Sequence, residues 1–491
     1  MTAHPISRRR AVQLAGLGAT SVAVGAAGWM SHLGEGSGSL HPATGEPLRD
    51  PTVLASAEGL LDVHLTAAAG VRLAGRSTTG FGYNGTSPGP TLRVRPGDLL
   101  RIRLTNRLDQ PTNLHTHGLH VSPTANGDNP FVTVEPGAGF DYAYRIPSDH
   151  PPGTLWYHPH HHGHVAEQIF AGLAGALIVE DTVTAPAAER TLVITDTTID
   201  GAGRVVSSNS MSKMMGREGQ WILINGQLAP TLTGIVDSTQ RWRIVNACTS
   251  RVLSLRLEEH RVTQLGIDGS TLPTPREVDR LVLAPGNRGD LLIRPAAAGR
   301  YSLISEAYDR GSPGMGMGMG GGASSTADPA ALATLLATTG SATPPPPRPP
   351  ATAAVPDGPI TATRHLTFAM GMNGGMGGMG SGGMAFTIDG RTFNANRTDQ
   401  TARLGSVEEW LITNTSPMDH PFHLHVWPFQ VIQDSAGSFL PGVPQDVVLV
   451  PAHGWTRIRV HLSDYPGRSV YHCHILDHED AGMMGTVQVD A

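Results

Sequence analysis

The sequence predicts an all-β protein built from three related β-sandwich domains in tandem. Glycine and proline are abundant, with 60 and 38 residues in a chain of 491, and this composition favours many turns over long helices. Short segments in which apolar and polar residues alternate recur along the chain, as in residues 99–104, and a period of two is typical of half-buried strands. The length exceeds what one hydrophobic core usually supports, so we expect two to four domains.

The N-terminus is predicted to be an export leader rather than part of the fold. A twin arginine in residues 7–12 (SRRRAV) precedes a weakly apolar, Ala- and Gly-rich run that reaches about Trp29. The pattern resembles a Tat signal, although Ala11 and Gln13 stand where that motif more often has Phe and Lys. The alternative is a single membrane anchor, which the short run with its glycines disfavours. We expect a periplasmic, cell-envelope or secreted protein without stable membrane insertion after export.

Three sets of strand-like segments define the expected domains. A motif of alternating residues that ends in asparagine recurs once in each set, at residues 100–106, 241–246 and 410–414, and indicates a repeated unit. The expected organisation is a leader at 1–42, domains at 43–182, 183–308 and 361–491, and a Met/Gly- and Pro-rich linker at 309–360. Within this linker, the Ala-rich residues 328–338 are expected to form a short helix.

Charge and cysteine usage narrow the class of protein. A formal net charge of -6 and a pI near 6.4 give no support for a nucleic-acid partner, which usually requires a basic face. The chain has only two cysteines, Cys248 and Cys473. If Cys473 binds a metal, Cys248 has no disulfide partner, and we expect it to be a buried, inert thiol.

The chemistry is concentrated in four histidine-rich stretches, of which the last, residues 470–478 (VYHCHILDH), surrounds Cys473. In a strand, His472 and His474 share one face while Cys473 points to the other, so the three residues can serve two metal centres. His420 is an odd number of residues from His423 and beyond a proline, which places it on the side of Cys473. One Cys, two His and a weak Met ligand form the ligand set of an electron-transfer copper site.

Two groups of metal ligands follow from this parity. A mononuclear site would use Cys473, His420 and His478, with Met483 as a long axial ligand. A three-metal cluster would use four His-x-His pairs. A single pair of this kind is more often a solvated strand or a zinc site, but four pairs beside a His-Cys-His run are not explained by scattered structural histidines. The eight cluster ligands are His115, His117, His158, His160, His423, His425, His472 and His474.

These four stretches resemble the copper signatures of the multicopper oxidases, the laccase-like family, over nearly the whole mature chain. The resemblance implies three cupredoxin-like (Greek-key) domains and four copper ions, of which one is type 1, one is type 2 and two are type 3. It implies one-electron oxidation of a reductant at the type 1 site and reduction of dioxygen to water at the three-copper cluster. On matching positions, His115 and His423 are type 2 ligands, and the other six cluster histidines are type 3 ligands.

The same resemblance extends to the path of electrons and protons. We expect electrons to enter through an exposed edge of His420 or His478 and to pass from Cys473 into His472 and His474. Glu479 and Asp128 match acidic positions that the family uses, so they are the candidate catalytic carboxylates for proton supply. The alternative for both is a solvated surface acid.

The expected function is oxidation of phenolic compounds, Cu(I) or both by dioxygen, with a role in copper tolerance. Eight methionines between Met315 and Met384 lie in glycine-rich sequence, and thioethers bind Cu(I); Met211, Met214 and Met215 add to this set. The alternative for these methionines is low-complexity linker drift. The alternative functions are a copper-containing nitrite reductase and a non-catalytic copper-sequestering protein.

Overall fold

The computed structural model describes residues 45–180, 189–312, 329–343, 348–372 and 384–491. The chain divides into two units, residues 1–42 and 43–491, and all described residues belong to the second unit. The predicted Tat leader therefore lies outside the described residues. None of the helices in the described ranges is long and apolar enough to cross a membrane.

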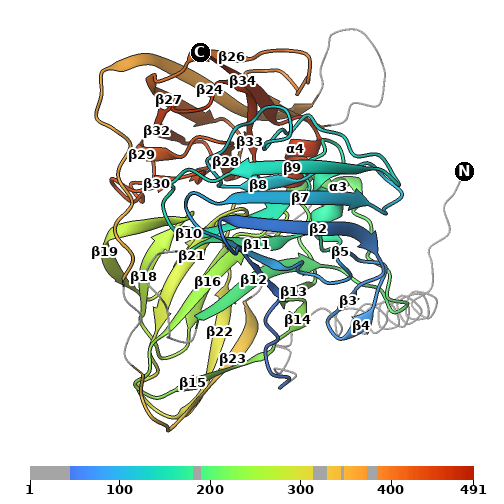
Figure 1. Cartoon of the computed structure of the whole chain (residues 1–491), viewed down its shortest axis with the longest axis vertical. Helices are drawn as coiled ribbons and strands as arrows, with labels where there is room; N and C mark the ends of the chain where they lie inside the picture. Colours follow the sequence, from blue (N-terminus) through green and yellow to red (C-terminus); the bar gives the residue numbers. More distant parts are fainter. Residues whose placement is uncertain (1–44, 181–188, 313–328, 344–347, 373–383) are drawn as a thin grey trace, which may run out of the picture. The chain divides into compact units, whose positions relative to one another are not determined.

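Six sheets in the described ranges form three β-sandwiches, which we call the first, middle and last sandwich (Figure 1). In each of them, apolar side chains from two sheets share one buried core, because alternation along every strand sends one face of each sheet inward. The predicted all-β fold of three sandwiches is confirmed.

The strands are ordered as follows in each sheet. The first sandwich has β5(Phe81–Tyr83)-β2(Leu60–Ala69)-β7(Leu99–Asn106)-β9(Gly139–Arg145) and β1(Val53–Ala55)-β6(Thr91–Val94)-β11(Gly175–Val179)-β10(Gly153–His158)-β8(His115–His117). The middle sandwich has β14(Gln227–Leu228)-β13(Trp221–Ile224)-β12(Glu189–Thr197)-β16(Gln240–Asn246)-β21(Arg288–Ile293)-β18(Val262–Ile267)-β19(Ser270–Val278) and β15(Thr231–Ile235)-β23(Ala330–Thr338)-β22(Gly299–Glu306)-β17(Leu253–Leu257)-β20(Leu281–Leu283). The last sandwich has β25(Met384–Ile388)-β24(Ile360–Met372)-β27(Val407–Asn414)-β32(Trp455–His461)-β29(Phe429–Asp434)-β30(Pro444–Gln445) and β26(Gln400–Arg403)-β34(Met484–Asp490)-β33(Gly467–Cys473)-β28(His420–Leu424)-β31(Val447–Val450). A separate hairpin joins β3(Arg72–Leu73) to β4(Arg76–Ser77).

The three sandwiches repeat one pairing scheme. In the first sheets, β7, β16 and β27 each pair in parallel with an earlier strand and antiparallel with a later one. Each of these strands ends in an asparagine that closes the following turn in the same way. Asn106, Asn246 and Asn414 accept, through Oδ1, the backbone N–H two residues later at 2.9, 3.1 and 3.0 Å. The short repeat in the sequence is therefore a shared turn closure.

The second sheets show why only two sandwiches supply cluster histidines. In the first sandwich β8 pairs antiparallel with β10, as β28 does with β33 in the last sandwich and β17 with β22 in the middle one. In the first and last sandwiches these strands carry or directly precede the histidine pairs, whereas LSLRL of β17 and GRYSLISE of β22 contain no histidine. The cluster ligands thus come from equivalent strands of the two outer repeats.

The Ala-rich part of the predicted linker departs from expectation. Residues 330–338 form β23, which pairs in parallel with β15 and antiparallel with β22, so the predicted short helix is wrong. Alanine and leucine favour helices in isolation, but burial of Leu332 and Leu335 between paired strands outweighs that preference.

Two other parts of the predicted linker lie outside the described residues. They are the first methionine group, Met315 to Met319, and prolines 344–347.

Three short helices occur in the described ranges, α2(Val165–Phe170), α3(Ser210–Met215) and α4(Leu476–Asp480). Both α2 and α3 contact α4.

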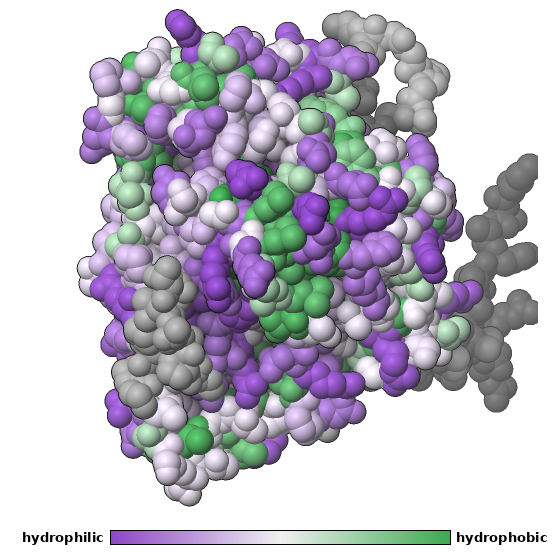
Figure 2. Space-filling view, in the orientation of Figure 1, coloured by the Kyte–Doolittle hydropathy of each residue, from purple (hydrophilic) through white to green (hydrophobic). Residues whose placement is uncertain are grey.

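The face in Figure 2 mixes hydrophilic and hydrophobic residues, with hydrophobic residues gathered near the centre of the view. Large apolar side chains with more than a third of their surface exposed are few in the described ranges, and Met211 on α3 is one of them, at 48%.

Candidate metal centres

Cys473, His420 and His478 converge into the predicted mononuclear site. Strands β28 and β33 are antiparallel neighbours, which brings His420, at the start of β28, to Cys473, at the end of β33. The helix α4 follows directly and returns His478 to the same point. His420 Nδ1 lies 3.2 Å from Cys473 Sγ, and His478 Nδ1 lies 3.4 Å from His420 Nδ1. Their ligand atoms lie within 4.8 Å of one another.

The outer nitrogen of each imidazole in this site is held by an oxygen atom. His420 Nε2 lies 2.8 Å from Ser416 Oγ, and His478 Nε2 lies 3.0 Å from the carbonyl oxygen of Met214. Because a carbonyl oxygen only accepts, the Nε2 of His478 must carry the proton. Its Nδ1 therefore presents a lone pair toward Cys473.

Burial corrects one prediction about this site. His420 and His478 are both 0% exposed, so the expectation that electrons enter through an exposed edge of either ring is wrong. The backbone of α3 covers His478, and Phe386 stacks on its ring at 4.2 Å between centroids. Met483 is also fully buried in the same core as Cys473, and its carbonyl accepts the Cys473 N–H at 3.0 Å. Its role as axial ligand stays a prediction.

All eight histidines of the predicted cluster come together in one buried group, each of them at most 2% exposed. His160, His425 and His472 form one subset, in which His472 Nε2 lies 3.2 Å from both other Nε2 atoms. His117, His158 and His474 form a second subset with ring centroids 5.1 to 5.9 Å apart. The remaining pair, His115 and His423, has its centroids at 5.7 Å. Contacts also cross these subsets, with His115 stacked on His425 and His117 stacked on His423 at 3.8 Å between centroids, so the assignment into type 3 and type 2 ligands stays a prediction.

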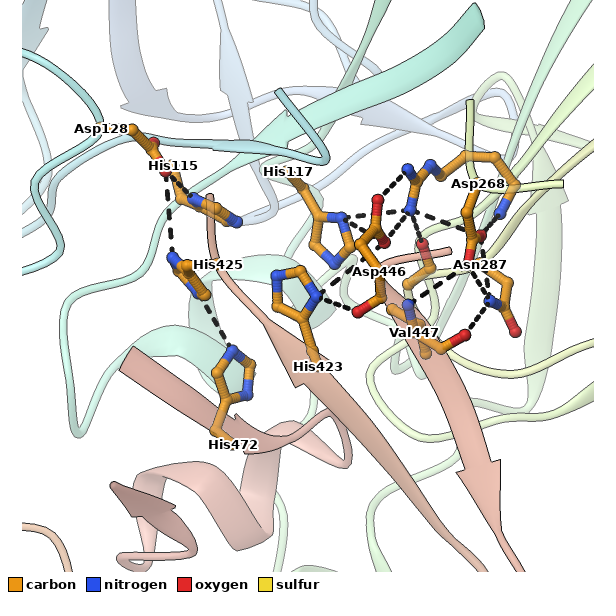
Figure 3. A network of polar contacts seen from close by, with 12 residues as sticks. His115, His117, Asp128, Asp268, Asn287, His423, His425, Asp446, Val447 and His472 are labelled. Atoms are coloured by element: carbon orange, nitrogen blue, oxygen red, sulfur yellow. Dashed lines mark hydrogen bonds and ion pairs between the residues drawn. The ribbon is translucent and has the colours of Figure 1, made fainter. Parts of the chain in front are cut away.

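Oxygen atoms fix the orientation of several of these rings (Figure 3). Nδ1 of His115 lies 2.8 Å from Asp128 Oδ2, Nδ1 of His158 lies 2.9 Å from the Pro159 carbonyl, and Nδ1 of His423 lies 2.7 Å from the Asp446 carbonyl. A carbonyl oxygen accepts from Nδ1–H and leaves the Nε2 lone pair free, which is the arrangement that metal-binding histidines require.

The free nitrogens fit a metal cluster. Among the described residues, Nε2 of His115, His117, His158 and His423 is buried without a hydrogen-bond partner, although such atoms are normally paired. Burial, followed by the neighbouring imidazoles, lowers the pKa of His158 to about 3, so the ring is in the neutral state that binds metals at neutral pH. Imidazole suits copper, and thiolate with imidazole selects it further.

The two predicted carboxylates lie beside the cluster, which excludes the alternative that they are solvated surface acids. Glu479 is 0% exposed, with Oε2 3.1 Å from His472 Nδ1 and Oε1 3.3 Å from His160 Nε2. Burial alone would raise the pKa of Glu479, but His472 and His160 bring it well below its usual range. Asp128 is 1% exposed, and burial raises its pKa to about 7 against the opposing hydrogen bonds from Thr116.

Comparison with known proteins identifies the family. Residues 66–184, 154–319 and 364–491 match sequence families described as multicopper oxidase. A multicopper oxidase structure from Campylobacter jejuni, titled a metallo-oxidase, has a TM-score of 0.78 at 30% identity, covering 91% of this chain and 96% of that one. The chain belongs to the multicopper oxidase family. Multicopper oxidase mco of Staphylococcus haemolyticus is 28% identical over 428 residues, 83% of each chain. A laccase of Bacillus subtilis is 27% identical over 477 residues, 83% of this chain and 90% of the laccase.

Membership in the multicopper oxidase family settles the cofactor and the class of reaction. The protein is a copper-dependent oxidoreductase with dioxygen as acceptor, and its three sandwiches are cupredoxin-like. Multicopper oxidases use four copper ions, one type 1, one type 2 and two type 3, and this chain contains several buried histidine groups that could hold metal ions.

Some site residues were not found from the sequence. Ser416 holds His420, the Met214 carbonyl holds His478, and Asp446 and Arg288 contact the cluster histidines. Every residue has a backbone carbonyl, so the sequence does not show which carbonyl will accept a hydrogen bond from a histidine. The buried Arg288–Asp446 pair joins two sandwiches, and its two residues have no characteristic spacing in the sequence. Cys248 is buried as predicted, and its Sγ lies 3.8 Å from the Ile194 carbonyl.

Proposed function

We propose that this multicopper oxidase takes electrons one at a time from Cu(I) and from phenolic compounds and reduces dioxygen to water in a four-electron reaction, with a role in copper tolerance. The proposed type 1 ligands are His420, Cys473, His478 and Met483. The eight buried histidines are the proposed type 2 and type 3 ligands, in the assignment given above.

One observation supports this proposal above all others. Cys473 lies in the mononuclear site, while its two chain neighbours, His472 and His474, lie in the eight-histidine cluster. Bound copper at the two sites would supply one-electron oxidation and oxygen reduction. The backbone between them is a covalent path of a few bonds, so electron transfer needs no diffusing carrier.

Glu479 is the proposed source of protons. Its carboxylate contacts two cluster histidines, one from each outer sandwich. Asp480, the next residue, accepts the backbone N–H groups of Gly163, Val165 and Ala166 at the start of α2. This contact fixes α4 and thereby the position of Glu479. Asp128 is proposed to orient His115 and to hold a second proton.

Methionines near the mononuclear site support Cu(I) as a reductant. Met214, Met370 and Met384 are half-buried and pack against the core that contains Cys473. Met370 pairs across β24 and β25 with Phe386, the residue stacked on His478. Thioethers bind Cu(I), so Cu(I) held here would lie at the entrance to the type 1 ligands. The methionines between Met372 and Met384 lie outside the described residues.

A cavity of about 460 Å³ between the middle and last sandwiches supports phenolic reductants. Apolar side chains that include Phe439 and Val448 line it, and Asp419, which precedes His420, lies in its wall. Tyr308 donates a hydrogen bond to Asp419 Oδ2 at 2.9 Å. A phenol ring would find apolar contact and a carboxylate acceptor here.

Oxygen uptake tests the proposal. Copper-loaded protein is given Cu(I) or a dimethoxyphenol, each with and without added Cu(II), and the variant Met214→Leu/Met384→Leu is compared with wild type. Leucine keeps the volume and removes the thioether. We expect a raised KM for Cu(I) and an unchanged KM for the phenol. Equal KM values for Cu(I) in both proteins would exclude these methionines.

Oxygen uptake and a separate assay of nitrite consumption distinguish the two other functions. A copper-sequestering protein would bind copper and consume no oxygen with either reductant. A nitrite reductase would consume nitrite under anaerobic conditions.

We also propose export by a Tat-type leader into the periplasm, the cell envelope or the medium. Replacement of Arg8 and Arg9 by Lys should then retain the protein in the cytoplasm.

A further inference from the structure

A buried arginine of the middle sandwich reaches the copper cluster, although that sandwich supplies none of the eight histidines. Arg288 begins β21 and is 0% exposed. Its Nη1 and Nη2 donate to Asp446 Oδ1 and Oδ2 at 2.6 and 2.5 Å, which is the fork-to-fork geometry of the strongest Arg–carboxylate pairs. The network is drawn in Figure 3.

Asp446 connects this arginine to two cluster histidines. Its carbonyl oxygen lies 2.7 Å from His423 Nδ1, and its Oδ1 lies 3.5 Å from His117 Nδ1. Arg288 Nη1 itself lies 3.2 Å from His117 Nδ1. The rings of His117 and His423 are stacked at 3.8 Å between centroids. One carboxylate residue thus contacts a type 2 ligand and a type 3 ligand, and Arg288 determines where that residue lies.

Arg288 is itself held by all three sandwiches. Its Nε donates to the Thr154 carbonyl of the first sandwich at 3.1 Å. Its backbone N–H donates to Asp268 Oδ1 at 3.0 Å, and Asn287 donates to both oxygens of the same carboxylate. Asp268 also accepts the N–H of Val447, the residue after Asp446, at 3.2 Å. The guanidinium therefore cannot move without displacing the segment that carries Asp446.

We propose that Arg288 is a positioning residue of the copper cluster, acting through Asp446 to hold His423 and His117 in their metal-binding orientation. The pair also places two buried carboxylates, Asp268 and Asp446, against one guanidinium. Residues of this kind, which orient metal ligands, typically change metal affinity 10- to 100-fold when replaced.

Copper binding and spectroscopy test the proposal independently of any reductant. The variants Arg288→Met and Arg288→Lys are stripped of metal and titrated with Cu(II), and copper per chain, the blue absorbance and the type 2 signal in the electron paramagnetic resonance spectrum are recorded. We expect the blue absorbance to be retained, the type 2 signal to be altered, and the affinity of the cluster for copper to fall by about 10- to 100-fold.

Arg241→Lys is the matched control. Arg241 is also buried and forms a bidentate pair with Asp290 of the same strand β21, and the printed side-chain partners of Asp290 among the described residues are Arg241 and Arg243, not the proposed copper ligands. This variant should lose stability while it keeps wild-type copper binding and a wild-type type 2 signal. If Arg288→Met does not fold, Arg288→Lys decides. A wild-type type 2 signal and copper affinity in a folded Arg288 variant would overturn the proposal, whatever reductant the enzyme uses.

Discussion

The Nε2 atom of His478 lies 3.0 Å from the carbonyl oxygen of Met214, so that α3 of the middle sandwich covers His478, a proposed type 1 ligand of the last sandwich. Contacts at both ends of α3 hold the helix in this position. Asn209 caps the start of α3 by accepting the Ser212 N–H at 2.8 Å, and Arg217, two residues after the helix, pairs with Asp477 of α4 at 2.7 Å. A bulky reductant that approaches His478 from this side must pass around or through α3, whereas no described residue of α3 lines the cavity beside Asp419.

Loosening α3 should therefore change the range of reductants. The Asn209→Ala variant removes the capping hydrogen bond, which costs about 1 kcal/mol of helix stability. This raises the population of the displaced helix about fivefold. We expect kcat/KM for a bulky phenol to rise by up to this factor, and kcat/KM for Cu(I) to fall because Met214 is displaced. Steady-state oxygen uptake with both reductants measures the two effects.

The conservative variant Asn209→Ser provides the control for α3, because serine also caps helices. It should behave as wild type with both reductants. Equal kcat/KM values for the bulky phenol in wild type and in Asn209→Ala would show that α3 does not limit access.

The two buried cysteines should differ completely in their effect on activity. Cys473→Ser removes the thiolate between the two copper sites, and we expect loss of both the blue absorbance and oxygen consumption. Cys248→Ser alters an equally buried thiol in the core of the middle sandwich, and it should retain both. Absorbance spectra and oxygen uptake after copper loading decide the matter. Blue absorbance in folded Cys473→Ser would contradict the assignment of this residue.

Much of the site could be predicted from the sequence, because side-chain parity in strands is a local property. His472 and Cys473 lie on opposite faces of any extended strand, and His420 is out of phase with His423. The spacing alone therefore separated the ligands into the two groups that the distances show. The sandwich fold followed in the same way from alternation and turn residues.

The remainder depends on contacts between sandwiches, which no local pattern encodes. His478 is buried because it contacts Met214 of α3, which lies more than 250 positions away in the sequence. The local sequence around His478 does not show this contact, so the expected exposed imidazole edge was wrong. Arg288 and Asp446 are 158 positions apart and look like ordinary charged residues in the sequence. The strand at 330–338 was missed because its partners, β15 and β22, and not its own composition, determine its structure.

Replacement of Glu479 should separate electron transfer from oxygen reduction. Glu479→Gln keeps the shape of the side chain next to His472 and His160 but cannot release or accept a proton. We expect oxygen turnover to fall about 100-fold, while anaerobic bleaching of the blue colour by reductant proceeds as in wild type. Glu167→Gln, at an exposed position on α2, serves as control. Unchanged turnover in Glu479→Gln would assign proton supply to another group.

Acid should destabilise the protein through His150, a buried histidine outside the copper sites. Burial lowers its pKa to about 4, and the nearby charge of His120 acts in the same direction, against the Pro151 hydrogen bond and Asp149. Its Nδ1 lies 2.8 Å from the Pro151 carbonyl and its Nε2 accepts the His120 N–H, so a second proton would replace an acceptor with a donor. The unfolded chain binds that proton near pH 6.5.

The stability that neutral His150 contributes is therefore fully present above about pH 6.5 and is lost as the pH falls toward 4. Between pH 7 and pH 5, wild type should lose about 2 kcal/mol more unfolding free energy than His150→Gln, which cannot take up the proton. Urea denaturation of both proteins at the two pH values measures this difference, and the absolute stability of the variant does not enter it. An equal loss in the two proteins would mean that His150 is protonated in the folded state at pH 5, and that its burial does not lower its pKa.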